Sequence, residues 1–299
     1  RAPRGRRRAS GALGLALAVV VASLAVSCSD GEGAGGAAGD HPNILFVVTD
    51  DMAVGDLAAM SLLAEWLGDE GTSFTRAYVS VSLCCPSRAT MLRGQYAHNT
   101  GVLSNEGTNG GFPVAHQLGI EASTVATWLQ GAGYRTGLVG KYLNYYPLGA
   151  GTTYVPPGWD DWVSPVAGSS ESGFDYTLNE NGRLVRYGDD PDDYSAHVLV
   201  DRAAALATRA AAADQPFFTW LAVDAPHEPA TPAPQDADAF AGERAPRTEA
   251  FDRVDESAPD WVRDLPALTR AQKDEIDDRH RSRWASLRSL DRELARLAR

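Results

Sequence analysis

The sequence predicts an α/β domain with a largely parallel central sheet flanked by helices. The first observation is a continuous apolar run over residues 43–49 (NILFVVT), which is typical of a strand buried on both faces of a parallel sheet. The second is that further strand patterns alternate with helix patterns along the chain, as they do in parallel α/β folds. No internal repeat is visible among the 299 residues.

Residues 123–141 (STVATWLQGAGYRTGLVGK) predict a helix and then a short strand over 136–140. Gly131 and Gly133 are expected to end the helix, because glycine is the usual residue at helix C-termini. The residues expected to share one face of this helix are Val125, Trp128 and Leu129.

Residues 174–188 (FDYTLNENGRLVRYG) predict a β-hairpin, because Asn181-Gly182 is a strong tight-turn pair. Residues 195–229 then predict a long helix followed by a buried strand over 217–223. The apolar residues aligned along this helix are Leu199, Ala203, Leu206 and Ala210.

The last seventy residues divide into an irregular stretch and a helix. Residues 229–268 are rich in Pro, Asp and Ala and are expected to form long surface loops. Thr269 and Gln272 have the spacing of a capping box, which predicts that a helix begins there. Its apolar stripe is Trp284, Leu287, Leu290, Leu294 and Leu297.

The N-terminal residues resemble an export signal. Five arginines precede an uncharged apolar run over residues 11–26, which is short for a membrane span and typical of a secretory signal. The run ends in small residues before Cys28, an arrangement that is similar to a bacterial lipoprotein signal with Cys28 as the lipidated residue. An ordinary signal peptide with an incidental cysteine is the alternative. We therefore expect a signal over 1–27, a flexible tether over 28–42 and a domain over 43–299.

Composition restricts the class of protein. The chain is 44% hydrophobic, which indicates a globular protein, and its formal charge is −12. Removing residues 1–27 would take that charge to −17. So acidic a chain is a poor nucleic-acid binder and would repel anionic substrates unless cations are concentrated locally. Three cysteines, two of them adjacent, do not provide a disulfide framework.

Polar residues follow three of the predicted strands. Asp50 and Asp51 follow the first strand, Lys141 follows the second, and Asp224 and His227 follow the third. Ligands of open α/β sheets collect at the carboxyl ends of strands, so these side chains are expected to converge. Paired carboxylates favour Ca²⁺ or Mg²⁺ over zinc. The alternatives are a helix cap for the aspartates, a solvated lysine and a loop histidine.

Residues 84–94 (CCPSRATMLRG) resemble the type I sulfatase signature C-x-P-S-R-x-x-x-[LM]-x-G, with Arg93 in place of the usual threonine. The resemblance extends to NILFVVTDD, QYAHNTGV, GKYLN, FDYTLNENG, PHEP and RWASLRSLD, in that order. It is closest to the N-acetylglucosamine-6-sulfatase and bacterial arylsulfatase branch. The resemblance implies an alkaline-phosphatase-like sandwich. The alternative for Cys84 alone is a small buried apolar residue.

The resemblance also implies a chemistry. In that family the first cysteine of the signature, here Cys84, is oxidised by a formylglycine-generating enzyme to an aldehyde. Its hydrate attacks the sulfur of a sulfate ester through one hydroxyl, and the second hydroxyl allows sulfate to leave, which a serine or thiol nucleophile could not do. Asp50, Asp51 and the oxygen at position 84 would hold Ca²⁺, with Mg²⁺ possible. Arg88 would orient the diol, Lys141 would bind sulfate, and His227 would protonate the leaving oxygen.

The family pattern continues beyond what this sequence contains. The family completes its metal site with an S-D-N-G segment and a C-terminal subdomain, neither of which is present before residue 299. A truncated sulfatase with an open sheet edge, prone to aggregation and of doubtful activity, is therefore expected. Phosphonate or phosphate ester hydrolysis, and a non-catalytic surface protein that binds sulfated glycans, are the alternatives. The expected location is the outer face of a bacterial membrane, by lipid anchor, or the extracellular space.

Overall fold

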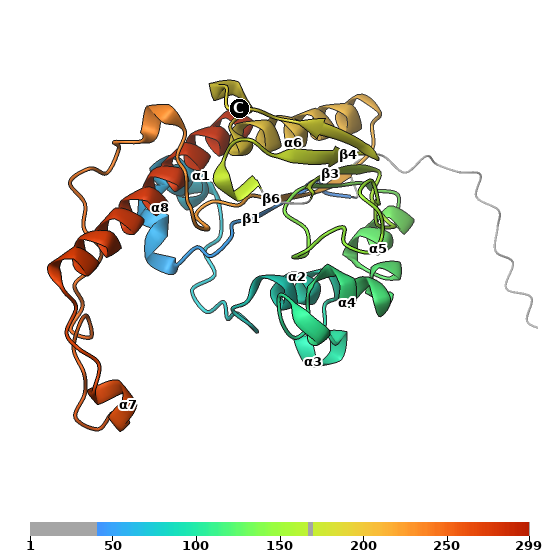
Figure 1. Ribbon diagram of the computed structural model, residues 1–299. Coiled ribbons are helices and arrows are strands. Elements are labelled where there is room, and N and C mark those ends of the chain that lie inside the picture. Colours follow the sequence, from blue (N-terminus) through green and yellow to red (C-terminus); the bar gives the residue numbers. More distant parts are fainter. Residues whose placement is uncertain (1–40, 167–169, 299) are drawn as a thin grey trace, which may run out of the picture. The chain divides into compact units, whose positions relative to one another are not determined.

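A mixed sheet organises the part of the chain that the computed structural model describes, residues 41–166 and 170–298 (Figure 1). These residues belong to one compact unit, Ala38–Arg299. The strand order is β1-β6-β2-β3-β4-β5. The first four strands run parallel, and β4 and β5 are antiparallel to their neighbours. The strands are β1 (Ile44–Val48), β2 (Arg135–Gly140), β3 (Asp161–Pro165), β4 (Thr177–Glu180), β5 (Arg183–Arg186) and β6 (Phe217–Ala222).

Helices cover both faces of this sheet, which gives the layered α/β fold that the sequence predicts (Figure 1). On one face, α6 and α8 pack against Val139 and Leu221. On the other, α2, α4 and α5 pack against Leu138 and Trp220, the next residues along the same strands. The helices are α1 (Ser61–Glu70), α2 (Cys84–Arg93), α3 (Ala97–Thr100), α4 (Gly111–Gln117), α5 (Val125–Gly131), α6 (Ser195–Ala212), α7 (Asp260–Arg263) and α8 (Arg270–Leu297).

The first strand differs from its prediction in one respect. Strand β1 does pair in parallel with β6, but within the described residues β6 is its only partner, so β1 forms an edge of the sheet. Leu45 and Phe46 point to opposite faces and are 39% and 37% exposed. The expectation of full burial on both faces is therefore wrong.

The hairpin and the two long helices form as predicted. Asn181 and Gly182 join β4 to β5 with φ angles of 52° and 86°, the left-handed geometry of a tight hairpin turn. All four aligned residues of α6 are buried. Helix α8 begins at the predicted capping box, where the Thr269 hydroxyl accepts the N–H of Gln272.

Helix α5 is short, and two of the three predicted residues, Val125 and Leu129, pack against the core, whereas Trp128 does not. Trp128 is 49% exposed, and its indole N–H donates to the Ser123 hydroxyl. Ala126 is the residue that α5 buries completely.

None of the helices that the structure describes is long and apolar enough to cross a membrane. The predicted signal and Cys28 lie outside the described residues.

Candidate active site

Three adjacent strands end at the same edge of the sheet, and the predicted polar residues follow them. Asp50 comes two residues after β1, and Lys141 comes directly after β2. The Asp50 N–H donates to the carbonyl of Ala225, and the Lys141 N–H donates to that of Ala222, so the end of β6 and the loop after it hold both. At Gly140 the chain passes so close to Ala222 that a Cβ atom would lie 1.9 Å from its carbonyl oxygen. Glycine is required there.

Asp50 lies between two cations. Its Oδ2 atom is 2.5 Å from Lys141 Nζ, and its Oδ1 atom is 3.4 Å from an Arg88 guanidinium nitrogen. All three side chains are buried. Burial opposes ionisation of Asp50, but Arg88 and Lys141 outweigh it and lower the pKa of the carboxyl group. Because Lys141 is buried and paired with Asp50, the alternative of a solvated lysine is wrong.

The two adjacent cysteines occupy different environments. Cys84 is the first residue of α2 and is partly exposed to solvent. Its sulfur lies within 4.8 Å of an Asp50 carboxylate oxygen. Cys85 is completely buried in the core beneath α2, and its N–H donates to Asn105 Oδ1 at 2.8 Å. Burial raises the pKa of the Cys85 thiol to about 11. Cys84 alone is therefore accessible to chemistry at this edge.

Burial and the carboxylate of Asp50 raise the pKa of the Cys84 thiol as well. A cysteine that acts as a nucleophile normally has a lowered pKa, because the thiolate is the reactive form. The surroundings of Cys84 thus disfavour a thiolate. They are unlike those of a cysteine-dependent hydrolase.

His227 approaches from the loop after β6. Its Nδ1 atom is 2.7 Å from the Glu228 carbonyl, to which the Nδ1–H donates, and its Nε2 atom is 3.6 Å from Asp51 Oδ2. Asp51 is exposed and adopts φ of 60°, which aspartate tolerates better than most residues. Asp50, Cys84, Arg88, Lys141 and His227, which we call the strand-end cluster, come together as the sequence predicts.

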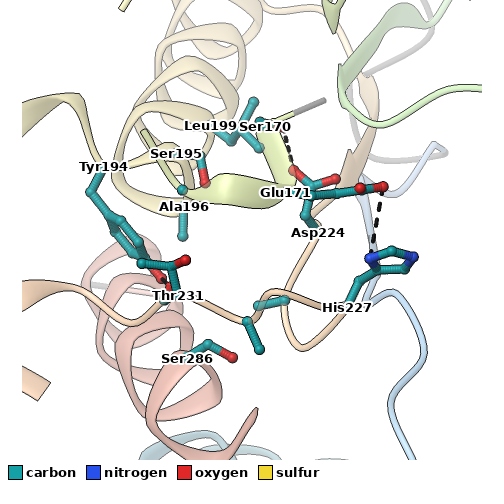
Figure 2. Close-up of a pocket in the computed structure, with 13 residues that line it drawn as sticks. Ser170, Glu171, Tyr194, Ser195, Ala196, Leu199, Asp224, His227, Thr231 and Ser286 are labelled. Atoms are coloured by element: carbon teal, nitrogen blue, oxygen red, sulfur yellow. Dashed lines mark hydrogen bonds and ion pairs between the residues drawn. The ribbon is translucent and has the colours of Figure 1, made fainter. Parts of the chain in front are cut away.

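Sequence reasoning missed one member of this region, Glu171. It lies in a short 3-10 helix, Ser170–Ser172, between β3 and β4, and its carboxylate is 3.0 Å from Lys141 Nζ and 3.8 Å from His227 Nδ1 (Figure 2). A glycine- and serine-rich loop carries no periodicity that would reveal this placement.

Asp224 also lies beside the cluster, with a carboxylate oxygen within 4.8 Å of one of Asp50, and the Ser170 hydroxyl donates to its Oδ2 atom (Figure 2). Its other oxygen is buried with no hydrogen-bond partner among the described protein atoms, and burial raises the pKa of Asp224 to about 6. The adjoining hollow holds about 10 Å³, enough for one water molecule but not for a sugar.

Two groups of side chains among the described residues have the spacing of metal ligands. Asp50, Cys84 and His227 offer atoms that lie within 4.8 Å of one another, and so do Asp50, Glu171 and Asp224. Asp50 belongs to both groups. Asp51 belongs to neither, although the sequence predicts it as a ligand. Carboxylate oxygens predominate, and these are the donors that Ca²⁺ and Mg²⁺ prefer.

Comparison with known protein families agrees with this geometry. The family model described as Sulfatase matches residues 42–299. The chain belongs to the sulfatase family. The match covers every member of the strand-end cluster and the whole described sheet.

Curated sulfatases are similar to this chain over most of its length. The human N-acetylglucosamine-6-sulfatase is 33% identical over 84% of this chain and 46% of its own length. The Volvox carteri arylsulfatase is 30% identical over 85% of this chain and 43% of its own length. The Drosophila melanogaster extracellular sulfatase SULF-1 homolog is 33% identical over 74% of this chain and 20% of its own length. The chain thus spans less than half the length of these relatives.

Solved structures share the fold. One, a protein in complex with its substrate D-glucosamine-2-N,6-O-disulfate, has a TM-score of 0.63 at 19% identity over 86% of this chain and 61% of its own. Another, in complex with k-i-k-neocarrahexaose, has a TM-score of 0.58 at 21% identity over 86% of this chain and 54% of its own. The α/β sandwich predicted from the sequence is confirmed.

Proposed function

We propose that the protein to which this chain belongs hydrolyses sulfate monoesters of sugars or aryl alcohols, with residue 84 as the nucleophile after conversion to formylglycine. The observation that carries the proposal is the convergence of Cys84, Asp50 and Lys141 at one sheet edge, with Cys84 at the first position of the signature. The phosphonate hydrolase and non-catalytic alternatives have no comparable support, because the relatives that match are sulfatases.

Position 84 is suited to an oxygen nucleophile. It opens α2, where backbone N–H groups point outward and favour negative charge. The hydrated aldehyde of formylglycine supplies a hydroxyl that attacks and a second that permits release. Arg88 stands one turn further along α2 with its guanidinium 3.4 Å from Asp50, and it would orient the diol at residue 84.

Lys141 and His227 have separate roles in the proposal. The Lys141 ammonium, the one lysine in the strand-end cluster, attracts the sulfate group into a chain whose formal charge is −12. His227 holds its Nδ1–H on the Glu228 carbonyl, which leaves Nε2 available to carry a proton to the leaving alcohol.

The donor set fits Ca²⁺, with Mg²⁺ as the alternative. Asp50 would hold the ion together with the oxygen at position 84, and Asp51, which lies outside both ligand groups, would have to turn toward it. The ion would neutralise charge on the sulfate oxygens. These residues provide fewer oxygens than the roughly six to eight that Ca²⁺ takes. The proposal therefore requires further oxygens from substrate, water or other parts of the full-length protein.

The test compares two neighbouring cysteines in the full-length protein, expressed with a formylglycine-generating enzyme. Mass spectrometry should find the Cys84 peptide lighter, with a carbonyl oxygen in place of the sulfur. Cys84→Ala should lower turnover of 4-nitrophenyl sulfate by about 1,000-fold or more. Cys85→Ala is the matched control and should retain most of the turnover. An unmodified Cys84 in an active enzyme would refute the proposal.

We also propose export, with Cys28 as the lipid-anchored residue at the outer membrane face and residues 28–42 as the tether. The support is the N-terminal pattern and the name of the extracellular relative. Labelled fatty acid should be incorporated into the wild-type protein but not into Cys28→Ser. Equal labelling of both would count against the anchor.

A further inference from the structure

An open cleft of about 870 Å³ extends from the strand-end cluster along the loop after β2. Lys141 and Glu171, which belong to the strand-end region, line it, and so do Glu106, Tyr145 and Leu148 from the loops. Cavities of this size hold small-molecule ligands. If sulfate binds at Lys141, the alcohol that carries it would occupy this cleft.

Tyr145 has the features of a residue held for binding. Its side chain is 54% exposed, and its φ of 66° is a strained value for a residue with a bulky side chain. Strain of this kind is found at ligand-binding positions, where surrounding contacts maintain it. The half-exposed ring presents an apolar face and a polar edge to the cleft, a combination suited to a sugar ring.

Glu106 is the contact that holds Tyr145 in place. The Tyr145 hydroxyl donates to Glu106 Oε2 at 2.7 Å. The Glu106 backbone is fixed in turn by the Ser104 hydroxyl, which accepts its N–H and donates to its carbonyl. The preceding residue, Asn105, binds the start of α2 through the Cys85 N–H. The Glu106–Tyr145 pair is therefore fixed relative to residue 84.

The charges of the cleft favour some substrates over others. Among the described residues that line it, Lys141 is the only cation, and it is paired with Asp50 and Glu171. Glu106 and Glu171 supply two carboxylates. A second anionic group on the substrate would therefore meet like charge, with no further cation among the described lining residues to compensate it.

We propose, on the basis of the proposed sulfatase function, that this cleft binds the ring bearing the sulfate ester and selects sugars with no second anionic substituent. Tyr145 stacks on the ring, and Glu106 accepts a hydrogen bond from a hydroxyl or amide N–H and repels a second sulfate or a carboxylate. The expected substrate class is the monosulfate of a neutral or amino sugar.

The test of charge selection compares N-acetylglucosamine 6-sulfate with glucosamine 2-N,6-O-disulfate on the full-length, formylglycine-containing enzyme. The wild type should prefer the monosulfate in kcat/KM by about tenfold or more. Glu106→Gln should reduce this preference by about fivefold, whereas Glu249→Gln, on an exposed glutamate outside the cleft, should leave it unchanged. Equal turnover of both sugars by the wild type, or an unchanged ratio in Glu106→Gln, would overturn the proposal.

The role of the ring is tested with two substitutions at one position. Tyr145→Asn removes the ring but tolerates the positive φ, and it should raise KM for the monosulfate by about tenfold with a smaller change in kcat. Tyr145→Phe keeps the ring and loses only the bond to Glu106, so its KM should rise less. An unchanged KM in Tyr145→Asn would contradict the stacking role.

Binding of the unsulfated sugar separates this proposal from the proposed function. Saturation-transfer NMR with N-acetylglucosamine should detect contact with the wild type and a weaker signal with Tyr145→Asn. If that result is obtained while no sulfate ester is hydrolysed, the sulfatase function fails and the cleft assignment stands. If sulfate esters are hydrolysed but the sugar signal is absent or insensitive to Tyr145→Asn, the cleft assignment fails alone.

Discussion

The guanidinium of Arg88 connects two segments of the site that are distant in sequence. One nitrogen donates to the Lys141 carbonyl at 2.7 Å, and another lies 3.4 Å from Asp50 Oδ1. A lysine has one ammonium group on a flexible stem and cannot reproduce this forked geometry. Arg88 therefore holds the loop after β2 in register with the end of β1.

We expect Arg88→Lys to lower kcat/KM of the full-length enzyme by about 100-fold, because small misplacements of catalytic groups have large effects. Its melting temperature should change much less. Arg186→Lys is the control, since Arg186 is exposed and lies far along the chain in β5. Equal loss of activity in both variants would argue against the positioning role.

The residues of the strand-end cluster could be predicted because each follows a recognisable strand or begins a recognisable helix. Glu171 and the Glu106–Tyr145 pair could not. Their positions depend on how three loops pack against one another, and loops carry no periodic signal. Sequence reasoning thus predicted the candidate catalytic residues but missed these residues of the proposed substrate cleft.

At the scale of elements, two charged residues join the last long helix to the first segments of the domain. The Asp291 carboxylate on α8 accepts the N–H groups of Leu62 and Leu63 at 2.9 and 2.7 Å. Met60, the residue before α1, has no side-chain cap to offer. Asp291 therefore caps α1 from a helix more than two hundred residues away in sequence.

We expect Asp291→Ala to lower the free energy of unfolding by about 2 kcal/mol, because it leaves two N–H groups of α1 without a partner. Asp274→Ala on the exposed side of α8 is the control and should change stability by about 0.5 kcal/mol or less. Urea unfolding followed by circular dichroism measures both. Similar effects in the two variants would mean that the cap contributes little.

The second contact joins Asp56, in the segment before α1, to Arg283 and Trp284 of α8, and its contribution to stability depends on pH. Burial opposes ionisation of Asp56, but hydrogen bonds from the Ala53 N–H, Arg283 and Trp284 outweigh it and lower the pKa of the carboxyl group. A carboxylate whose pKa is lowered by folding stabilises the protein above its unfolded pKa. That contribution is lost as the pH falls through the folded-state pKa.

Asp56→Asn should therefore be less stable than the wild type at pH 7, and the difference should shrink as the pH is lowered from roughly 5 to 2. Unfolding curves across this range measure the difference. A gap that stays constant with pH would show that the charge of Asp56 is not what stabilises the contact.

The element predictions failed where a pattern is compatible with two environments. A continuous apolar run such as β1 is compatible with a central strand and with an edge strand, because the sequence of a strand does not show how many neighbouring strands pair with it. In α5, helical spacing aligned Trp128 with Val125 and Leu129, but Trp128 is half-exposed and the small residue Ala126 is fully buried. The sequence shows which residues share a helix face, but it does not show how deeply each of them is buried against the neighbouring sheet.

At the scale of the whole molecule, the exposed edge of β1 affects solubility. An edge strand with exposed Leu45 and Phe46 presents unpaired backbone groups beside apolar surface, which favours association with another chain.

Leu45→Lys should reduce light scattering of the 299-residue chain on storage and change its unfolding midpoint little. Leu265→Lys, on an exposed leucine outside the sheet, is the matched control and should leave the scattering unchanged. Equal scattering by Leu45→Lys and the unsubstituted chain would locate self-association elsewhere.

The parallel arrangement of β1, β6 and β2 brings carboxylates from one strand end and a lysine from another to one point, and this leads to a prediction about calcium. An ion that binds the folded form alone stabilises it by mass action, so saturating Ca²⁺ should raise the melting temperature of the full-length protein by about 2 to 4 °C. Asp50→Asn removes the carboxylate common to both candidate ligand groups and should abolish the shift. Asp274→Asn, with its side chain on the surface of α8, should preserve it. Because Mg²⁺ demands a stricter octahedral geometry, it should raise the melting temperature less than Ca²⁺ does at equal concentration.

The same Ca²⁺ response in Asp50→Asn and the wild type would place the ion outside the strand-end cluster, and the proposed metal ligands would then be wrong.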